Sequence, residues 1–379
     1  MPISASGRLL SLQQLQRRLD RLRQLQNRLR LPPGHFEALG RRYYLPLRTE
    51  HAQSLKRVSP RLLGYLAGFF DGDGCVTPCT DKSGIRLSVS QAESHGVVLL
   101  LFRNIFGGSI VRLRHAGGLC RPSLQWHLVG GTAQQVATNL SASAVCKRTQ
   151  LAIAGSWPQE PSLRCEAAAR MKLLEQEAPA EATCPSWQYL TGFFDAEGCI
   201  VLMYPAYLRL EIKQKFLPVL RSIQGFLARH GVDCIVREKQ SHGLLVVRNT
   251  ENCKFVLAKL IRSGLRVKRE AARLAIQVCA GDFFIIRSNL RRLVGNQGHD
   301  KRLSIDGLVR AAGIKQIQAR LRCLTGKQHS HLERSELESQ LLVLQKDHKL
   351  KCGQERLLRI RSDIRSFISV GATVPASPR

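Results

Sequence analysis

Two pairs of acidic residues stand at the ends of two nearly identical segments of the chain. The first segment, YLAGFFDGDG, runs from Tyr65 to Gly74, and the second, YLTGFFDAEG, runs from Tyr189 to Gly198. Eight of the ten positions are identical or exchange one acid for another. The apolar start of each segment predicts a helix, and the closing glycine predicts a C-terminal cap in the left-handed conformation. Both acid pairs are therefore expected at helix C-termini.

The position of these acids predicts that they bind a metal ion. The helix macrodipole disfavours a carboxylate at a C-terminus by about 0.3–1 kcal/mol, and packing two such ends together adds repulsion. A divalent cation neutralises both carboxylates at once. Oxygen ligands without His or Cys beside them favour Mg²⁺. The alternative is a pair of apolar helices whose acidic ends are simply solvated. The acids concerned are Asp71, Asp73, Asp195 and Glu197.

The similarity between the two segments extends along the chain. The segments are 124 residues apart, measured between Gly68 and Gly192, and two later pairs of polar residues keep nearly the same offset. A nearly constant offset over three anchors indicates two copies of one unit. The later pairs are Gln91 with Gln214 and Lys147 with Lys268.

Each copy predicts a mixed α+β unit. Short alternating runs of apolar and polar residues predict strands, longer apolar stretches predict helices, and hairpin-length connections favour an antiparallel sheet. The strands are expected at 85–90, 109–114 and 124–129 in the first copy and at 207–213, 234–239 and 244–248 in the second. The helices are expected at 97–106, 133–140, 218–230 and 253–262, with a further one near 164–177 between the copies.

Small residues on one face of each motif helix predict how the two copies meet. Gly64, Ala67 and Gly68 share a face at helical spacing. Thr191 and Gly192 occupy the corresponding places in the second helix. Small side chains allow two helix backbones to approach closely, so we expect the two helices to pack together about a pseudo-two-fold axis. Both copies lie in one chain, and we expect that chain to be a monomer.

The two motifs resemble the signature motifs of monomeric LAGLIDADG homing endonucleases, and the resemblance covers about residues 60 to 280. It implies an α+β fold of tandem duplicated αββαββα units, which form a pseudo-two-fold saddle of antiparallel sheets over DNA. It implies a site-specific endonuclease that hydrolyses phosphodiester bonds of double-stranded DNA across the minor groove, in a metal-dependent reaction. The family also includes RNA-binding intron maturases, so a maturase or splicing factor with little or no cleavage is the alternative.

The resemblance also assigns roles to the repeated polar residues. The catalytic, metal-binding acids would be Asp73 and Glu197, which would hold Mg²⁺ or Mn²⁺ near the scissile phosphates. Two lysines would stabilise charge on the phosphate or tune the attacking water, and two glutamines would orient water. For a lysine the alternative is a solvated charge. These residues, at positions where the family often has active-site polar groups, are Lys147, Lys268, Gln91 and Gln214.

Basic residues on the predicted strands are expected to face the DNA. A two-stranded ribbon fits the major groove, where Arg is the usual reader of guanine, although some of these residues would contact only phosphate or face water. Alternation puts residues two apart on one sheet face, which pairs Arg112 with Arg114, Arg209 with Lys213, and Arg237 with Lys239. The expected DNA-binding residues are Arg86, Arg112, Arg114, Arg209, Lys213, Arg237, Lys239 and Arg248.

The composition favours a nucleic-acid partner in a reducing compartment. The 58 Lys and Arg residues against 28 Asp and Glu give a net charge of +30, and a polyanion such as double-stranded DNA or intron RNA would relieve the self-repulsion. The sequence has no apolar run long enough to predict a membrane span. The 12 cysteines contain no CxxC pair, so reduced thiols in an intracellular setting are expected rather than a zinc site.

The residues outside the repeats predict helical extensions. The first 31 are rich in Arg and have leucines at helical spacing, which fits either a mitochondrial or plastid transit peptide or an amphipathic surface helix. Residues 305–324 form either a helix-turn-helix or a helical brace, and Ser330 predicts a capping box that opens a helix. The expected domains are an N-terminal helical extension or transit peptide at 1–58, a first unit at 59–153, a linker at 154–186, a second unit at 187–282 and a basic helical extension at 283–379.

Overall fold

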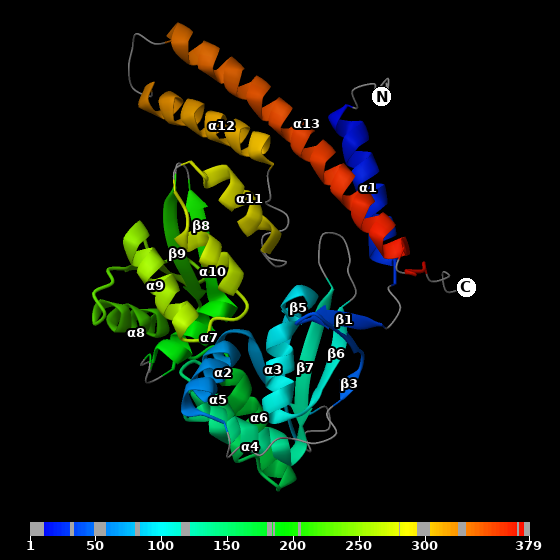
Figure 1. Ribbon diagram of the computed structural model, residues 1–379, viewed down its shortest axis with the longest axis vertical. Coiled ribbons are helices and arrows are strands. Elements are labelled where there is room, and N and C mark those ends of the chain that lie inside the picture. Colours follow the sequence, from blue (N-terminus) through cyan, green and yellow to red (C-terminus); the bar gives the residue numbers. More distant parts are fainter. Residues whose placement is uncertain are drawn as a thin grey trace. The chain divides into compact units, whose positions relative to one another are not determined.

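The chain folds into two units, one of which contains both repeats. The computed structural model describes residues 11–30, 34–48, 58–79, 84–114, 122–179, 184, 186–203, 206–279, 281–293, 304–324, 331–369 and 371–374. The repeat unit spans 34–114 and 122–295, and the helical unit contains 1–33, 115–121 and 296–379 (Figure 1). Among the described residues, no helix is both long enough and apolar enough to span a membrane.

The first repeat has the expected order of helix, two strands, helix, two strands and helix. Its elements are α2 (Pro60–Asp73), β4 (Gly74–Pro78), β5 (Ile85–Ala92), α3 (Gly96–Phe106), β6 (Ser109–Arg114), β7 (Ser123–Val129) and α4 (Gly130–Ser141). The strands form an antiparallel sheet in the order β6-β7-β5-β4.

The second repeat has the same order. Its elements are α7 (Trp187–Glu197), β8 (Gly198–Met203), β9 (Tyr207–Gln214), α8 (Leu217–Ala228), β10 (Ile235–Glu238), β11 (Gly243–Val247) and α9 (Thr250–Arg262). Its strands are antiparallel in the order β10-β11-β9-β8, which corresponds position by position to the first sheet. The predicted fold of two αββαββα units is therefore confirmed.

The structure adds elements that the sequence patterns did not predict. Strands β4 and β8 begin directly after the motif helices, and a further short helix closes each repeat, α5 (Arg148–Gly155) in the first and α10 (Arg269–Ile276) in the second. The segment between the repeats contains α6 (Pro161–Leu174), close to the helix expected there. The added strands extend each sheet from the end of its motif helix, so the motif acids lie where helix and sheet join.

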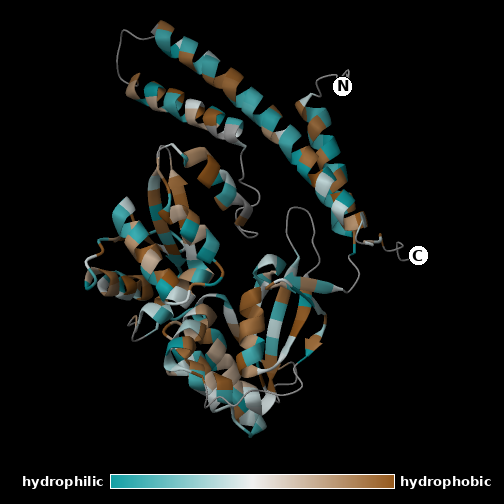
Figure 2. Cartoon of the chain, in the orientation of Figure 1, coloured by the Kyte–Doolittle hydropathy of each residue, from teal (hydrophilic) through white to brown (hydrophobic). Residues whose placement is uncertain are grey.

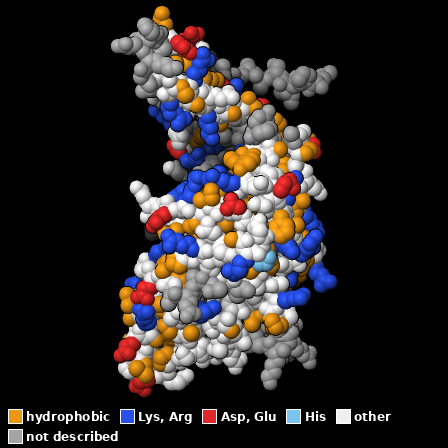
Figure 3. Space-filling model, turned by 90° about the vertical axis from the view of Figure 1, so that its left-hand side faces the viewer, with side chains coloured by type: hydrophobic (Ala, Val, Ile, Leu, Met, Phe, Trp, Pro, Cys, Tyr) orange, Lys and Arg blue, Asp and Glu red, His pale blue; other side chains and the backbone are white. Residues whose placement is uncertain are grey.

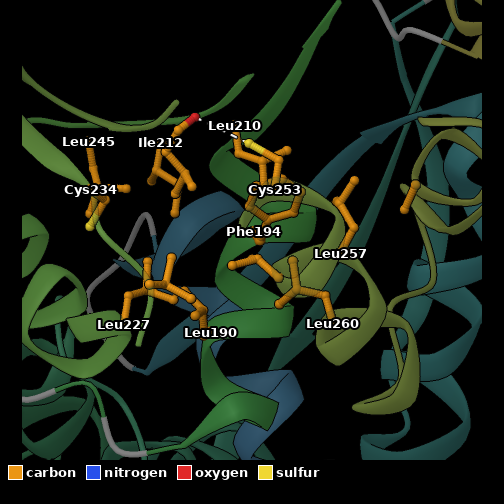
Figure 4. Packing of buried hydrophobic residues seen from close by; sticks show 14 of the residues in the cluster. Leu190, Phe194, Leu210, Ile212, Leu227, Cys234, Leu245, Cys253, Leu257 and Leu260 are labelled. Atoms are coloured by element: carbon orange, nitrogen blue, oxygen red, sulfur yellow. Dashed lines mark hydrogen bonds between the residues drawn. The ribbon is translucent and has the colours of Figure 1, made fainter. Parts of the chain in front are cut away.

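Each repeat has its own apolar core between one face of its sheet and its helices. In the second repeat, Phe194 from α7, Ile212 from β9 and Leu257 from α9 point into this core (Figure 4). Figure 2 shows hydrophobic residues along the strands and on the helices beside them. The opposite face of each sheet is its open face, and in the first sheet the polar residues of β7 that lie on this face alternate with the core residues of that strand.

The motif helices α2 and α7 hold the two repeats together through direct backbone contact. A Cβ atom added to Gly192 would overlap the carbonyl oxygen of Tyr65 and lie 2.7 Å from the backbone nitrogen of Phe69. A Cβ atom added to Gly68 would overlap the carbonyl oxygen of Tyr189 in the same way. The small-residue face predicted from the sequence is thus confirmed as the contact between the repeats.

The closing glycines of the motifs have a different role from the one predicted. Gly74 and Gly198 are not in the left-handed conformation, because their φ angles are −79° and −72°. The chain instead passes directly from helix into strand. A Cβ atom added to Gly74 would overlap Phe70, and one added to Gly198 would overlap Phe194. Glycine is required here by crowding and not by an unusual backbone angle.

The helical structure predicted for the N-terminal extension at 1–58 is wrong for residues 34–48. β1 (His35–Ala38) and β2 (Arg41–Tyr44) form a hairpin, and β3 (Leu47–Arg48) pairs with β6 at the edge of the first sheet. The hairpin turn uses positive φ angles at Leu39 and Gly40, and a Leu-Gly turn lacks the Asn or Asp that usually marks such turns. These strands belong to the repeat unit.

The helical unit consists of α1 (Leu12–Arg28), α12 (Ile305–Leu324) and α13 (His331–Ser369). Leu15 and Leu19 of α1 are buried in a cluster with Leu357, Ile360 and Ile364 of α13. A β-bridge between Arg30 and Thr373 adds a second link. The N-terminal leucine pattern therefore forms a packed face of this unit.

The C-terminal region differs from the prediction in two places. Residues 305–324 form the single helix α12 and not a helix-turn-helix, because Gly313 continues the helix. The repeat unit extends past residue 282 to include α11 (Phe283–Leu293), whose Phe283 and Ile286 are part of the second core. The predicted capping residue Ser330 lies outside the described residues, and α13 begins at the next position.

The contact between α2 and α7 predicts a strong effect of Gly192→Ala. The added methyl group overlaps backbone, which cannot rotate away, so we expect the free energy of unfolding to fall by at least about 1–3 kcal/mol. Gly131→Ala is the matched control, because Gly131 lies in α4 with open space around its Cβ position. That variant should keep or gain stability by up to about 1 kcal/mol. Equal urea-unfolding midpoints for the two variants would contradict the helix contact.

Candidate active site

Asp71 and Asp195 are buried and bind the backbone of their own repeats. Asp71 is 1% exposed and accepts the backbone N–H groups of residues 145, 146 and 147 at 2.5–2.9 Å. Asp195 is 2% exposed and accepts those of residues 266, 267 and 268 at 2.7–3.1 Å. These N–H groups lie at the N-terminal ends of α5 and α10, where the helix dipole favours an anion.

Each buried aspartate is also bonded to a tyrosine of the other repeat. The hydroxyl of Tyr189 donates to Asp71 at 2.7 Å, and that of Tyr65 donates to Asp195 at 2.8 Å. Burial, and then the neighbouring carboxylate, raise the pKa of both tyrosines well above the usual value. The tyrosines therefore remain donors, and the two hydrogen bonds join the repeats. Both tyrosines begin the repeated motifs, so the sequence contained this signal although no role was predicted for them.

Lys147 and Lys268 lie at the C-terminal ends of the motif helices. The Nζ atom of Lys147 donates to the carbonyl oxygen of Asp71. The Nζ atom of Lys268 donates to the carbonyl oxygen of Asp195, and to that of Ala196 at 3.2 Å. Burial lowers the pKa of Lys268, although nearby carboxylates oppose this change. Each lysine thus supplies the positive charge that the end of a motif helix favours.

These contacts correct part of the electrostatic argument made from the sequence. The first acid of each motif does not suffer from its position at a helix C-terminus, because a second helix presents its N-terminus to that acid. The macrodipole argument for a metal therefore applies to only one acid in each motif. Those acids are the ones predicted to be catalytic, Asp73 and Glu197.

Asp73 and Glu197 come together at the ends of the helix pair. A Cβ atom added to Gly72 would lie 3.2 Å from the Cγ atom of Glu197. Burial raises the pKa of Asp73. Burial and the Asp73 carboxylate raise the pKa of Glu197 to about 7. The pair is therefore charged only at a cost in free energy.

The two lysines compensate this pair across the repeat boundary. Lys268 of the second repeat acts on Asp73 more strongly than Lys147 does, and Lys147 of the first repeat acts on Glu197 more strongly than Lys268 does. Burial, joined at Glu197 by repulsion from the Asp73 carboxylate, nevertheless outweighs the lysines, because the pKa of each acid stays raised. The lysines thus offset only part of the cost of charging the two acids. A divalent cation would stabilise the charged form of both carboxylates.

The protein supplies a small set of oxygen ligands for such a cation. In the part of the chain that the structure describes, no group of three or more His, Cys, Asp or Glu side chains is arranged to hold a metal. The site offers the carboxylates of Asp73 and Glu197. Mg²⁺ commonly binds proteins through one or two carboxylates and keeps water or phosphate oxygens as its other ligands, so the donor set fits this ion.

The two predicted glutamines have different hydrogen-bond partners. The Nε2 atom of Gln91 donates to Oδ2 of Asp73 at 2.5 Å. The Nε2 atom of Gln214 donates to the Sγ atom of Cys146 at 3.8 Å. The structure therefore brings Gln91 to the acid pair and leaves Gln214 bonded to a residue that the sequence analysis did not identify.

Several of the predicted DNA-binding residues lie on the open face of a sheet. In β9, Leu208, Leu210 and Ile212 enter the core, so Arg209 and Lys213 share the opposite face. Arg209 is bonded there to Glu211 at 2.6 Å. The residues that are exposed are Arg86, Lys213, Arg237 and Lys239, and Arg248 is partly buried just after β11. Figure 3 shows Lys and Arg side chains spread over one face of the molecule.

The prediction that Arg112 faces the DNA is wrong. It pairs with the core residue Leu124 across the sheet, so it lies on the core side. Its guanidinium donates to Glu93 at 2.7 Å and to the carbonyl oxygen of His35 at 3.0 Å, and its side chain is 10% exposed. The sheet register is irregular between Arg112 and Arg114, and the side chain of Arg114 is outside the described parts.

Solved structures similar to this chain include LAGLIDADG endonucleases. The meganuclease I-AabMI bound to uncleaved DNA is 14% identical with a TM-score of 0.45, over 63% of this chain and 95% of that chain. The homing endonuclease I-SmaMI bound to cleaved DNA is 13% identical with a TM-score of 0.44, over 64% and 98%. I-SmaMI bound to an uncleaved DNA target with calcium ions is 12% identical with a TM-score of 0.43, over 61% and 93%.

The family that the two motifs resemble is thus also the family of these solved structures. No family model matches the sequence, and no curated protein matches it. The chain itself forms a duplicated unit with two paired acids at the junction of its halves.

The raised pKa of Glu197 predicts that the repeat unit is more stable in mild acid. The glutamate titrates near 4.5 in the unfolded chain and near 7 in the folded protein, so folding favours its protonated form. This stabilisation is complete below pH 4.5 and is lost as the pH rises through about 7. Without divalent cations, the free energy of unfolding should fall over this interval by at most about 3 kcal/mol.

Glu197→Gln should flatten this decline, because it removes the titrating group. Glu238→Gln is the matched control, since Glu238 is an exposed glutamate of β10. Urea unfolding of the three proteins at about pH 5 and about pH 8 would measure the effect. An unchanged decline in Glu197→Gln would show that this carboxyl is not the group that responds.

Proposed function

We propose that the protein is a site-specific, metal-dependent endonuclease that hydrolyses phosphodiester bonds of double-stranded DNA across the minor groove. The observation that carries this proposal is the acid pair Asp73 and Glu197, which two repeats place together at the ends of packed helices. A structural role does not account for two partly buried acids with raised pKa values. Perturbed carboxyls in a pre-formed arrangement are typical of functional sites.

Asp73 and Glu197 would hold Mg²⁺ or Mn²⁺ in this function. When bound, the metal would activate water and stabilise the leaving oxygen. Gln91 fixes the orientation of the Asp73 carboxylate through its 2.5 Å hydrogen bond. Lys147 and Lys268 are held by carbonyl oxygens of the motif helices, so their charges remain beside the acids, where they would stabilise a phosphate.

The open faces of the two sheets would bind the DNA. Exposed basic side chains such as Arg86, Lys213 and Arg237 lie on faces opposite the apolar cores. Phosphate contacts position a protein on DNA, and base contacts provide sequence specificity. Because one chain contains both acids and both sheets, a monomer would suffice for both strands.

A cleavage assay on a randomised DNA library with Mg²⁺ or Mn²⁺ tests the proposal. The wild-type protein should cut selected library members in both strands. The double variant Asp73→Asn with Glu197→Gln should keep its fold and its DNA affinity, because the sheets and their phosphate contacts are unchanged. Its cleavage should fall below detection, since no carboxylates remain to position a metal.

The matched control for that experiment changes two exposed acids, Glu238→Gln with Glu251→Gln, and should cut like the wild type. Loss of the fold in the double variant would show that the acids are structural. If the wild-type protein binds DNA and cuts no library member with either metal, the proposed nuclease function is wrong. A test of intron RNA binding would then examine the maturase alternative.

DNA affinity should also fall steeply with salt. The net charge of +30 and the exposed basic strand residues predict that many phosphates are neutralised in the complex. Contacts with roughly 6–10 phosphates would lower the affinity by about 10³–10⁵ between about 50 and 200 mM salt. Fluorescence anisotropy of labelled target DNA would measure this slope, and a flat response would contradict the proposed DNA surface.

A further inference from the structure

The two halves of the candidate active site differ in how their glutamines are held. Gln91 donates to Asp73 at 2.5 Å. Gln214 occupies the matching place at the end of β9, but its Nε2 atom donates to Cys146 at 3.8 Å and its Oε1 atom accepts the next backbone N–H at 2.6 Å. Both polar ends of Gln214 are therefore engaged, and neither of these bonds reaches Glu197.

The difference arises in the short segments that bind the buried aspartates. Residues 145–147 donate three backbone N–H groups to Asp71, and residues 266–268 donate three to Asp195 in the same way. The middle residue is Cys146 in the first segment and Val267 in the second. A thiol sulfur is a weak hydrogen-bond acceptor, whereas a valine side chain offers none. The first segment alone can thus hold a glutamine side chain from the opposite repeat.

The surroundings of Cys146 keep its sulfur a neutral thiol. Burial, and then the Asp71 carboxylate, raise the pKa of the Cys146 thiol above its ordinary value. Its backbone N–H donates to Asp71 at 2.9 Å, which fixes the position of the residue. The sulfur therefore stands at a defined place between Asp71 and Gln214.

We propose that Cys146 is a positioning residue that holds Gln214 away from Glu197 and so makes the two strand cleavages unequal. This inference rests on the proposed nuclease function. In the half built on Asp73 the glutamine is already bonded to the carboxylate, whereas Gln214 has first to leave the sulfur. The half with Gln91 therefore acts first, and nicked DNA accumulates before the second cut.

The variant Cys146→Val tests this role, because it gives the first repeat the residue that the second repeat has at the matching position. Gln214 loses its acceptor and becomes free to bond to Glu197. We expect the slower strand cleavage to accelerate about three- to tenfold, the factor that corresponds to one ordinary hydrogen bond. The faster cleavage should stay unchanged. The measurement follows nicked and linear forms of a supercoiled plasmid that carries a selected target site.

Two further variants separate this effect from a general change in packing. Cys146→Ala also removes the acceptor and should accelerate the slower cut in the same way. Cys146→Val combined with Gln214→Ala should show no acceleration over Gln214→Ala alone, because the gain requires the glutamine. Equal rates for the two strands in the wild type, or an unchanged ratio in Cys146→Val, would overturn the proposal.

A second arm of the experiment needs neither metal nor DNA. Side-chain amide resonances of Gln91 and Gln214 are compared by NMR before and after each acid is neutralised. The Gln91 amide should shift on Asp73→Asn, and the Gln214 amide should shift on Glu197→Gln only when Cys146→Val is also present. A Gln214 shift in the presence of Cys146 would overturn the proposal. The expected shifts in a protein that cuts no DNA would support the placement of Gln214 and overturn the nuclease function.

Discussion

The direct backbone contact between α2 and α7 is the constraint on which the rest of the structure depends. The carbonyl oxygen of Tyr65 lies against Gly192, and that of Tyr189 lies against Gly68, so neither glycine tolerates a side chain. Helices that touch through their backbones bring their C-terminal ends together as well. A wider separation would move the terminal acids apart and away from the lysine of the other repeat.

The buried aspartates connect three structures at each end of this helix pair. Asp71 lies in the last turn of its own helix, receives the N-terminal N–H groups of α5 and accepts the hydroxyl of Tyr189 from the other repeat. Asp195 does the same with α10 and Tyr65. A helix C-terminus and a helix N-terminus have dipole ends of opposite sign, so placing both beside one carboxylate removes the repulsion expected from the motif alone. The first acid of each motif thus stabilises the scaffold, and the second is left for chemistry.

Much of this arrangement could be predicted from the sequence, and the exceptions have physical reasons. The repeat, its sheets and the face of Gly68 follow from local periodicity and small residues. The N-terminus of α5 beside Asp71 could not be predicted, because it joins residues that are far apart in the chain. The inward orientation of Arg112 depends on which face of β6 meets the core, and alternation alone does not decide between two faces. Gln214 and Cys146 belong to different repeats. The offset between the copies identifies equivalent residues, and it does not predict which residues of one repeat contact the other.

Residues that are identical in the two repeats hold the repeats together, and residues that differ make the two halves unequal. Gly68 and Gly192, the two tyrosines and the first aspartates are the same in both copies because each one packs or bonds across the boundary between the repeats. Around this shared frame, Val145 enters the second core, whereas its counterpart Arg266 lies over the ring of Tyr65 at 5.6 Å. Fusion of the copies in one chain allows such differences, since a homodimer would have to repeat every change on both sides. In the proposed function, unequal halves suit a DNA target that itself has no two-fold symmetry.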